Sequence, residues 1–483
     1  MAAPPVLTLS DLTERAFART SGASLIPGNA VRVLLDAEEN YPAWLEAIRS
    51  AQRSIFFENY IIEEDEVGLA FAEELAQRAR AGVQVRLIRD WMGSRSGASH
   101  RFWRNLEEAG VELRVFNPPN LTSPLGWVSR DHRKMIAVDG RIGFVTGLCV
   151  SKRWLGDPAR RIPPWRDTGV ELRGPAVASV ERAFKEVWDA TGAPLPVEAL
   201  SDPGAIALAG DVSVRIVAGQ PTSTDLFRLD QLIAAAAQRT LWLTDAYFVG
   251  FVPYVQALRG AARDGVDVRL LVPSTTDIPL VSPLSRAGYR PLLEAGVRVF
   301  EWNGSMIHAK TAVADGRWAR VGSSNLNIAS FIGNYELDVA IEDASVARVL
   351  EEAYLRDLSN STEIVLSRHR RVRPLAPRGP AMPRGSGRPA VGAVRFANAV
   401  GAAAASGTRA LGAVEGGIEV ALAGGLLVLA AVAILWPAVV AYPLAFLGVW
   451  LSIALLLRAR RNAQQRKADR LAAHPSPGVP DAR

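Results

Sequence analysis

HRKMIAVDG at residues 132–140 returns as HAKTAVADG at residues 308–316. In both copies a lysine follows a histidine by two positions and an aspartate follows it by seven, although the 483 residues include only five histidines and five lysines. A double match of this kind is far less probable by chance than a match to one ordinary short motif. Because fifty of the 55 basic residues are arginine, lysine at both places indicates a need for a compact ammonium group.

The candidate catalytic residues are those of the two motifs: His132, Lys134, Asp139, His308, Lys310 and Asp315. Each copy predicts a short strand closed by an Asp-Gly hairpin turn, after which apolar residues resume. Side chains two positions apart project from one face of a strand, so each lysine is expected to point the same way as its histidine. The aspartate begins the turn, where its expected task is to fix the local geometry and not to attack a substrate.

An imidazole beside an ammonium group indicates a site for an anion such as a phosphate. Lysine supplies charge for a phosphate oxygen, and histidine can attack phosphorus or transfer a proton near neutral pH. With two copies, one histidine can form a phosphohistidine while the other protonates the leaving alcohol and deprotonates the incoming one. Because the lysines carry the positive charge, this chemistry requires no metal ion and no other cofactor.

The regions that precede the motifs are duplicated too. SIFFENYII (54–62) and GVQVRLIRD (82–90) precede the first motif, and TLWLTDAYF (240–248) and GVDVRLLVP (265–273) precede the second in the same order. A repeat of this length indicates a duplicated domain and not a solenoid.

Strand patterns alternate with helical patterns, the latter over residues 42–51, 69–81, 177–190 and 226–237, which predicts an α/β fold. We expect two pseudo-symmetric α-β-α halves that pack face to face, with both motifs in one cleft. The predicted boundaries are an N-terminal segment (1–30), the first half (31–205), the second half (206–365), a basic linker (366–415), a hydrophobic hairpin (416–460) and a basic tail (461–483).

Over about residues 30 to 360 the chain resembles the phospholipase D superfamily, which carries a duplicated His-x-Lys-x(4)-Asp motif. Downstream of the second motif, Gly322-Ser-Ser-Asn325 fits the family's Gly-Ser-x-Asn, and Asn334-Tyr-Glu336 fits its Asn-x-Glu. Trp165-Arg-Asp167 is similar to the Trp-Arg-Asp of bacterial cardiolipin synthases.

The resemblance implies roles for further residues. Ser323 and Asn325 would bind substrate, Glu336 would orient His132, and Asp167 would orient His308, so that each acid acts across the two halves. The alternative for each acid is a solvated charge at the end of a strand.

One position departs from the family pattern. Where the tail of the first motif usually carries an asparagine, the chain has Cys149, its only cysteine. We expect a small buried residue there in preference to a catalytic thiol. A single cysteine also excludes an intrachain disulfide.

Residues 420–457 contain no charged side chain. As one helix these 38 residues would be about 57 Å long, nearly twice the hydrocarbon core of a bilayer. Pro437 and Pro443 lie near the middle, which predicts a transmembrane or re-entrant helical hairpin; a hairpin buried in a soluble domain is the alternative. Arginines flank both ends, so both ends are expected on the cytoplasmic side.

The positive charge of the chain is concentrated in its tail. Residues 364–483 have a net charge of +12, which leaves −6 for residues 1–363 from the whole-chain value of +6. A basic segment beside a membrane hairpin favours anionic phospholipid as partner. A nuclease would be expected to have a basic catalytic domain, so we expect no nucleic-acid partner.

The resemblance therefore implies a phosphatidyltransferase at the cytoplasmic face of the bacterial inner membrane, which makes cardiolipin from two phosphatidylglycerol molecules through a phosphohistidine. In the family's more common assignment His132 is the nucleophile and His308 the general acid. The alternatives are a hydrolytic phospholipase D that releases phosphatidic acid, a membrane-tethered phosphodiesterase or nuclease, and an inactive lipid-binding scaffold.

Overall fold

The computed structural model describes residues 9–119, 129–278, 281–366 and 372–374, with four more positions at 442, 449, 450 and 452. The predicted hydrophobic hairpin (416–460), the tail (461–483) and the linker beyond residue 374 lie outside these described residues, those four positions excepted. In the described part of the chain, none of the helices is long and apolar enough to cross a bilayer.

The first half contains a mixed sheet with the strand order β1-β7-β6-β5-β2-β3-β4. Its strands are β1 (Ile26–Leu35), β2 (Ser54–Asn59), β3 (Gln84–Asp90), β4 (Glu112–Phe116), β5 (Met135–Val138), β6 (Ile142–Thr146) and β7 (Thr168–Arg173). Strands β2, β3 and β4 are parallel, and the others pair antiparallel.

The second half repeats this order as β8-β14-β13-β12-β9-β10-β11 and adds β15 and β16 at the far edge. Its strands are β8 (Val212–Gly219), β9 (Thr240–Thr244), β10 (Asp267–Pro273), β11 (Arg298–Trp302), β12 (Thr311–Ala314), β13 (Trp318–Gly322), β14 (Glu336–Glu342), β15 (Ser361–Leu366) and β16 (Val372–Pro374). The prediction of two related α/β halves is confirmed. Strand β16 pairs with β15 inside the region predicted as linker, so the sheet extends further than the sequence suggested.

The two halves are joined at a sheet edge as well as through their faces. Strands β1 and β8 pair antiparallel, which joins the sixteen strands of the described residues into one sheet. Strands β6 and β7 also pack against β13 and β14, and Val145, Val170, Val321 and Val339 share one buried apolar cluster. Packing through the faces was predicted, whereas the pairing of β1 with β8 was not.

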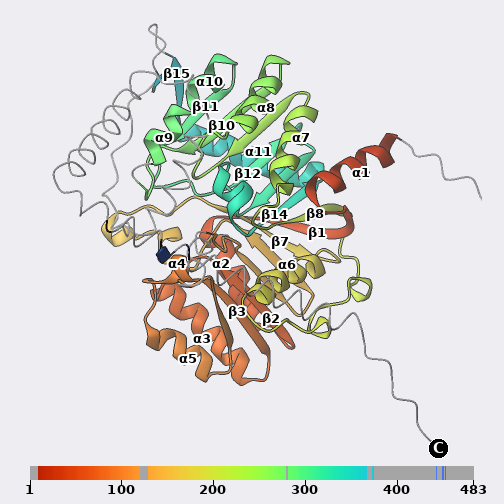
Figure 1. Ribbon diagram of the computed structural model, residues 1–483, viewed down its shortest axis with the longest axis vertical. Helices are drawn as coiled ribbons and strands as arrows, with labels where there is room; N and C mark the ends of the chain where they lie inside the picture. The colour runs from red at the N-terminus through yellow and green to blue at the C-terminus, as the bar shows by residue number, and fades with distance from the viewer. Residues whose placement is uncertain are drawn as a thin grey trace, which may run out of the picture. The chain divides into compact units, whose positions relative to one another are not determined.

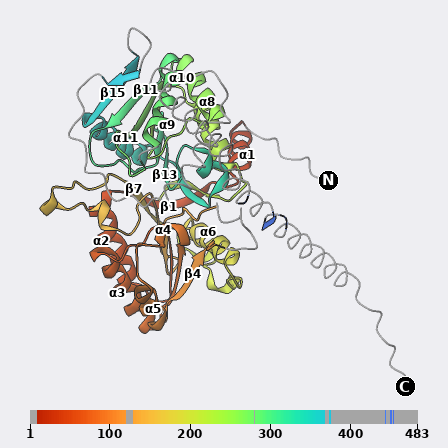
Figure 2. The same ribbon diagram turned by 60° about the vertical axis from the view of Figure 1, so that its left-hand side comes forward.

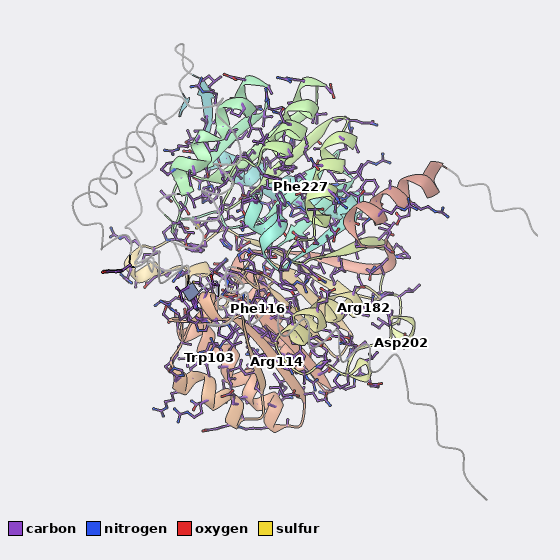
Figure 3. All side chains as sticks on the ribbon, viewed as in Figure 1. Trp103, Arg114, Phe116, Arg182, Asp202 and Phe227 are labelled. Atoms are coloured by element: carbon purple, nitrogen blue, oxygen red, sulfur yellow. The ribbon has the colours of Figure 1, made fainter. Side chains whose placement is uncertain are left out.

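Helices cover both faces of each sheet (Figure 1). The first half has α2 (Asp36–Arg49), α3 (Glu66–Arg80), α4 (Trp91–Ser94), α5 (His100–Glu108) and α6 (Val177–Ala190), and the second has α7 (Asp225–Ala236), α8 (Val252–Arg263), α9 (Val281–Ala287), α10 (Tyr289–Glu294) and α11 (Ala344–Ser359). Helices α2, α3 and α5 bury apolar side chains on one face of the first sheet. Helices α7, α8 and α10 do so on the second, where Phe227 of α7 (Figure 3) contacts the ring of Phe331. Helices α6 and α11 both contribute to the cluster shared between the halves.

The N-terminal helix α1 (Leu9–Ser21) packs on the second half although β1 follows it directly. It contacts α7, and Glu14 forms an ion pair with the buried guanidinium of Arg215 in β8. Figure 1 shows α1 beside β8 and α7. The segment that precedes the first half therefore ties that half to the second.

The predicted Asp-Gly turns are present in both halves. Asp139 and Asp315 have φ angles of 55° and 52°, and the glycines that follow have 66° and 65°, the left-handed conformation that both central residues of a type I′ turn require. The turns close the β5–β6 and β12–β13 hairpins. The motif strands and turns are thus as the spacing predicted.

Candidate active site

The two motif histidines are held by the backbone of the opposite half. The His132 amide donates to the Tyr335 carbonyl at 2.9 Å, and the Tyr335 amide donates to Arg130 at 2.9 Å. In the related arrangement the His308 amide donates to the Arg166 carbonyl at 2.6 Å. Each pair of segments forms a one-residue parallel β-bridge between the halves. Neither histidine is therefore positioned by its own half alone.

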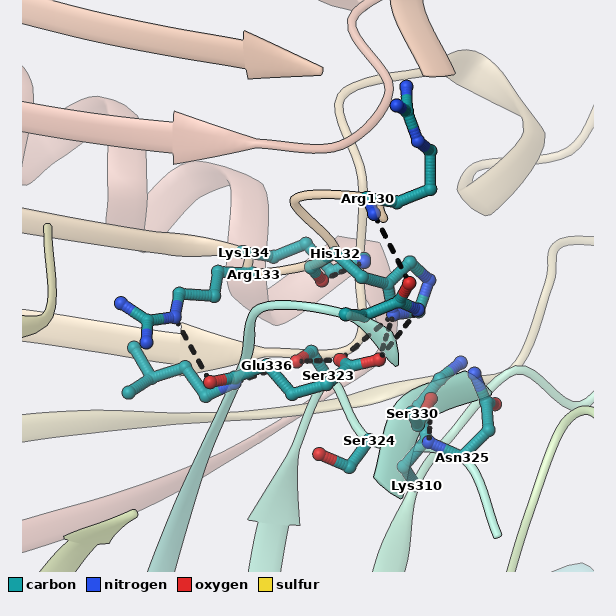
Figure 4. A network of polar contacts seen from close by, with 12 residues as sticks. Arg130, His132, Arg133, Lys134, Lys310, Ser323, Ser324, Asn325, Ser330 and Glu336 are labelled. Carbon is teal, nitrogen blue, oxygen red and sulfur yellow. Dashed lines mark hydrogen bonds and ion pairs between the residues drawn. The ribbon is translucent and has the colours of Figure 1, made fainter. Parts of the chain in front are cut away.

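A carboxylate from the opposite half contacts each imidazole. Nδ1 of His132 lies 2.9 Å from Oε2 of Glu336, and Nδ1 of His308 lies 2.7 Å from Oδ2 of Asp167. Figure 4 shows Glu336 extending from β14 toward His132. All four side chains are buried. Because a carboxylate next to Nδ1 favours a proton on that nitrogen, the chemistry of each ring falls to Nε2.

Each carboxylate is itself fixed by further donors. Asp167 accepts hydrogen bonds from the Trp154 indole at 2.8 Å and from the Thr168 amide at 2.8 Å. Glu336 accepts from the Ser323 hydroxyl and from the Asn334 amide group, the latter at 3.3 Å. These contacts hold the acids in the orientation that the imidazoles need.

The motif lysines lie beside their histidines and are fully buried. Nζ of Lys310 is 2.9 Å from Nδ1 of His308, and Nζ of Lys134 donates to the His132 carbonyl. The ring centroids of Tyr60 and Tyr247 lie 5.2 and 5.8 Å from the respective ammonium groups. The lysine and histidine of each motif thus lie side by side just before the strand, which begins at Met135 in the first half and at Thr311 in the second.

The electrostatics show that the groups of both halves interact. Burial, the charge of Lys310 and, more weakly, that of Lys134 lower the pKa of His308 to about 4. Burial, opposed by Asp167 but assisted by Lys134, lowers the pKa of Lys310 to about 8. Lys134 belongs to the first half and the other two groups to the second, so the two motifs lie close enough to share one electric field.

The two carboxylates differ in their protonation equilibria. Burial raises the pKa of Glu336 in spite of the opposing charge of Lys134. Burial acts in the same direction on Asp167, but the neighbouring His308 and Lys310 outweigh it, so that the pKa of Asp167 is lowered. Of the two histidine–carboxylate pairs, that of His308 with Asp167 therefore has the acid that holds its negative charge more firmly.

The motif aspartates lie in the hairpin turns and have the geometric task expected there, while a catalytic role for them stays a prediction. Asp139 accepts hydrogen bonds from the amides of residues 52, 53 and 54 at 2.8 to 2.9 Å. Asp315 does the same with residues 238, 239 and 240 at 2.7 to 2.9 Å. A strand separates each aspartate from its histidine, a path of about 20 Å along extended backbone. Both aspartates fasten a turn to the start of a neighbouring strand.

Ser323 and Asn325 have different surroundings. The Ser323 hydroxyl donates to Glu336 and accepts the Leu337 amide at 2.9 Å, so it helps to orient the acid. Oδ1 of Asn325 is buried and has no hydrogen-bond partner in the described structure. Asn325 thus retains an unused acceptor on the loop that carries Ser323 (Figure 4).

Cys149 occupies the corresponding place in the first half and is 1% exposed. Burial raises the pKa of its thiol against the opposing charge of Lys134, so the thiol remains protonated and is a poor nucleophile. The side chain belongs to the apolar cluster of the first half.

Sequence reasoning singled out Trp165 and Arg166 as part of a motif but assigned them no contacts, and it missed Trp154, Asp36 and Asp357. Trp154 and Trp165 contact the His308 ring, with centroids 5.3 and 5.7 Å away. The guanidinium of Arg166, whose side chain is 10% exposed, joins Asp36 of the first half to Asp357 of the second. The tryptophans beside the motif tail were a usable signal, whereas nothing local to residues 36 or 357 indicated an ion pair between the halves. No group of three or more possible metal ligands occurs within the described residues.

Comparisons with known proteins agree with this geometry. A family model described as "Cardiolipin synthase, PLD-like domain" matches residues 44–188 and 229–358. The chain is 34% identical over 342 residues to a cardiolipin synthase of Alkalihalophilus pseudofirmus, an alignment that covers 70% of this chain and 67% of that protein. It is 32% identical over 369 residues to cardiolipin synthase A of Pseudomonas fluorescens, covering 75% of each.

Among solved structures, a phosphatidylserine synthase of Haemophilus influenzae has a similar fold, with a TM-score of 0.57 and 15% sequence identity. The alignment covers 73% of this chain and 91% of that one. At this identity the likeness concerns the fold alone.

Proposed function

The chain belongs to the cardiolipin synthase family of phospholipase D-like proteins, and from this premise we propose that it transfers a phosphatidyl group from one phosphatidylglycerol molecule to another, forming cardiolipin and releasing glycerol. The observation that carries the proposal is the pair of imidazoles from different halves, each held by a carboxylate of the opposite half, with two buried lysines beside them. This arrangement supports phosphodiester transfer in two steps.

In the first step Nε2 of His132 attacks the phosphorus of the donor lipid. The bond between phosphorus and the glycerol headgroup oxygen breaks, and His308 gives its Nε2 proton to that oxygen, so that glycerol leaves and phosphatidyl-His132 remains. Lys134 and Lys310 stabilise the charge on the non-bridging oxygens. Glu336 stabilises the positive charge that develops on the His132 ring.

In the second step a headgroup hydroxyl of another phosphatidylglycerol replaces glycerol. His308, now neutral, accepts the hydroxyl proton while the oxygen attacks phosphorus, and the bond from phosphorus to His132 breaks. The products are cardiolipin and the regenerated enzyme. Water in place of the hydroxyl would give phosphatidic acid, so exclusion of water decides between synthesis and hydrolysis.

The low pKa of His308 fits this sequence when the substrate is included. Without ligand, burial and the charge of Lys310 keep the ring neutral at pH 7. A bound phosphodiester places a negative charge beside both lysines, which opposes their effect and raises the pKa of His308. Arrival of the substrate therefore favours the protonated general acid.

The proposal includes the cytoplasmic face of the membrane as the site of action. The uncharged segment 420–457, the arginines that flank it and the +12 charge of residues 364–483 support a C-terminal membrane hairpin beside anionic lipid. The bacterial cardiolipin synthases to which the chain is similar support an association with membranes.

The test is to incubate the purified full-length protein with phosphatidylglycerol and to analyse lipids and glycerol by mass spectrometry. Cardiolipin and glycerol in equal amounts are expected, with no product from His132→Ala or His308→Ala. Phosphatidic acid without cardiolipin would mean that the protein is a hydrolase and not a synthase. Undiminished turnover by either variant would refute the two-histidine scheme.

A further inference from the structure

The first half contains a hairpin that the second half lacks. The chain needs 18 positions to pass from Cys149 to Asp167, but only 11 from Asn325 to Glu336, which are the corresponding residues. The seven additional residues lie in the segment 155–164, called here the 155–164 hairpin. Because the second half forms its histidine–carboxylate pair without such a segment, the fold of the site does not require it.

The 155–164 hairpin is held together by backbone hydrogen bonds. Asp157 and Ile162 pair antiparallel, with N–O distances of 2.7 and 2.9 Å, and Oδ1 of Asp157 accepts the Arg160 amide at 3.1 Å. Gly156 has a φ of 73°, and a Cβ at this position would lie 2.5 Å from the Ile162 carbonyl oxygen. Only glycine allows the returning strand to pass so closely.

The base of the hairpin belongs to the active site. Trp154 precedes it and Trp165 follows it, their ring centroids lie 4.9 Å apart, and both rings contact His308. The Ser305 hydroxyl of the second half donates to the Pro164 carbonyl. The base of the hairpin is therefore anchored beside His308 and to the second half.

The tip is exposed and carries both apolar and basic groups. Leu155 is 37% exposed, and the other exposed residues are Pro158, Ala159, Arg160, Arg161, Pro163 and Pro164. Residues 155–164 have a net charge of +1, from Arg160, Arg161 and Asp157, on a portion of the chain (1–363) whose net charge is −6. Neither Arg160 nor Arg161 forms an ion pair with another described residue. In Figures 1 and 2 the gold segment around these residues projects from the left of the ribbon.

We propose that the 155–164 hairpin docks on the surface of an anionic phospholipid bilayer and so presents the active site to lipid headgroups. Arg160 and Arg161 would contact lipid phosphates, and Leu155 with the prolines would enter the interfacial region. The inference rests on the proposed function, because it names the surface from which that reaction draws its substrate. The net positive charge of the hairpin on an acidic domain is what selects an anionic surface.

A fluorescent label at the tip tests the contact without any need for turnover. The only native cysteine is 1% exposed, so Ala159→Cys in the full-length protein can be labelled selectively with an environment-sensitive dye. Vesicles with phosphatidylglycerol should shift its emission to the blue, spin-labelled lipids should quench it, and added salt should weaken both effects. The same label at Arg104→Cys on α5, also an exposed site, is the control and should respond to neither.

A charge reversal tests the consequence for activity. Arg160→Glu with Arg161→Glu should reduce kcat/KM on phosphatidylglycerol vesicles by about tenfold or more, because two charges that face the lipid change sign. Turnover of monomeric short-chain phosphatidylglycerol should stay within about twofold of the unaltered enzyme, since the catalytic groups are unchanged. The matched control on α5, Arg101→Glu with Arg104→Glu, should leave both activities unchanged.

The possible failures are distinguishable. Equal loss on vesicles and on monomeric lipid would mean that the hairpin supports the site and does not dock. A label that responds to a short oligonucleotide and not to vesicles would overturn lipid as the partner. An unaltered enzyme that leaves monomeric phosphatidylglycerol intact while the label still responds to vesicles would refute the proposed reaction but not the docking surface.

Discussion

Replacing Asp167 by asparagine should disable His308 while leaving the volume of the side chain unchanged. The carboxylate meets three N–H donors: Oδ2 accepts from His308 at 2.7 Å and from Trp154 at 2.8 Å, and Oδ1 accepts from the Thr168 amide at 2.8 Å. An amide has only one oxygen, so whichever way it is placed its NH2 group faces at least one of these donors. With the NH2 group toward His308, the ring must also move its proton to Nε2, which is the wrong tautomer for a base.

The two consequences have different magnitudes. A buried donor left unsatisfied costs about 1–3 kcal/mol of stability. The lost negative charge and the wrong tautomer act on the transition state, and the equivalent change in a serine protease triad lowers kcat by about 10⁴-fold. We therefore expect Asp167→Asn to lower kcat by about 10³- to 10⁴-fold, or about 4–5 kcal/mol of barrier at 1.36 kcal/mol per tenfold.

The assay is kcat for the formation of cardiolipin, with the melting temperature measured in parallel. Adding Trp154→Phe to Asp167→Asn removes one of the opposed donors, so the double variant should recover part of the lost stability but none of the lost kcat. A single variant that keeps kcat within tenfold of the unaltered enzyme would show that Asp167 does not set the tautomer or charge of His308.

Three other perturbations test separate parts of the structure. Because the pKa of Lys310 is lowered to about 8, chiefly by burial, kcat/KM should fall as the pH rises through 8. The variant Lys310→Arg stays charged and should lack this alkaline decline. A decline of equal shape in the variant would show that it does not come from Lys310. Asp139→Ala leaves the amides of residues 52, 53 and 54 without their acceptor. It should therefore lower the free energy of unfolding in urea by about 2 kcal/mol or more, while kcat changes less than threefold. A collapse of kcat in the folded variant would show that Asp139 is needed for catalysis. Glu58 and Asp131 are fully buried, and no described donor contacts either oxygen of Glu58. Burial and the repulsion between the two acids raise the pKa of Glu58, and burial raises the pKa of Asp131 to about 7. The folded state then binds more protons than the unfolded state above about pH 4, so stability should fall from pH 5 to pH 8, and Glu58→Gln should flatten this fall; parallel curves for the two proteins would exclude a shared proton.

Local patterns in the sequence were sufficient for the parts of the fold that depend on near neighbours. The strand of each motif, its Asp-Gly turn and the common side of histidine and lysine all follow from side-chain alternation and the turn conformation of Asp-Gly. The start of α2 did not follow, because Pro42 suggested a first turn at that position. In the structure the helix begins at Asp36, and the Asn40 side chain donates to the carbonyls of Leu34 and Asp36 at 3.0 and 2.8 Å. A side chain that bonds the backbone of this first turn leaves no periodic signal.

The parts of the site that depend on contacts between distant residues were harder to predict from the sequence. The partnership of Asp167 with His308 came from the family resemblance and not from any local pattern. The residues that link the halves, such as Arg166 with Asp357, are 191 positions apart in the chain. The sequence could suggest that such a partner existed, because a buried charge needs one, but it could not say which acid would be opposite.

The two halves reach the same histidine–carboxylate geometry with different neighbours. Gly147 and Ser323 both lie fifteen positions after their motif histidine. A Cβ on Gly147 would lie 2.2 Å from Oδ1 of Asp167, so the short aspartate fits only because this position is glycine. The longer Glu336 leaves room for Ser323, whose hydroxyl then bonds to it.

This divergence explains why the two imidazoles differ electrostatically although the fold that carries them is duplicated. The pKa of Asp167 is lowered by its close contact with His308 and Lys310, whereas burial raises that of Glu336. The stronger negative charge therefore faces His308, which in the proposed mechanism loses a proton in the first step and regains one in the second. His132, which in that mechanism carries the phosphatidyl group, faces the acid with the raised pKa. A duplicated site can divide one reaction between two equal side chains only if their surroundings differ, and here the difference begins at a glycine and a serine in corresponding positions.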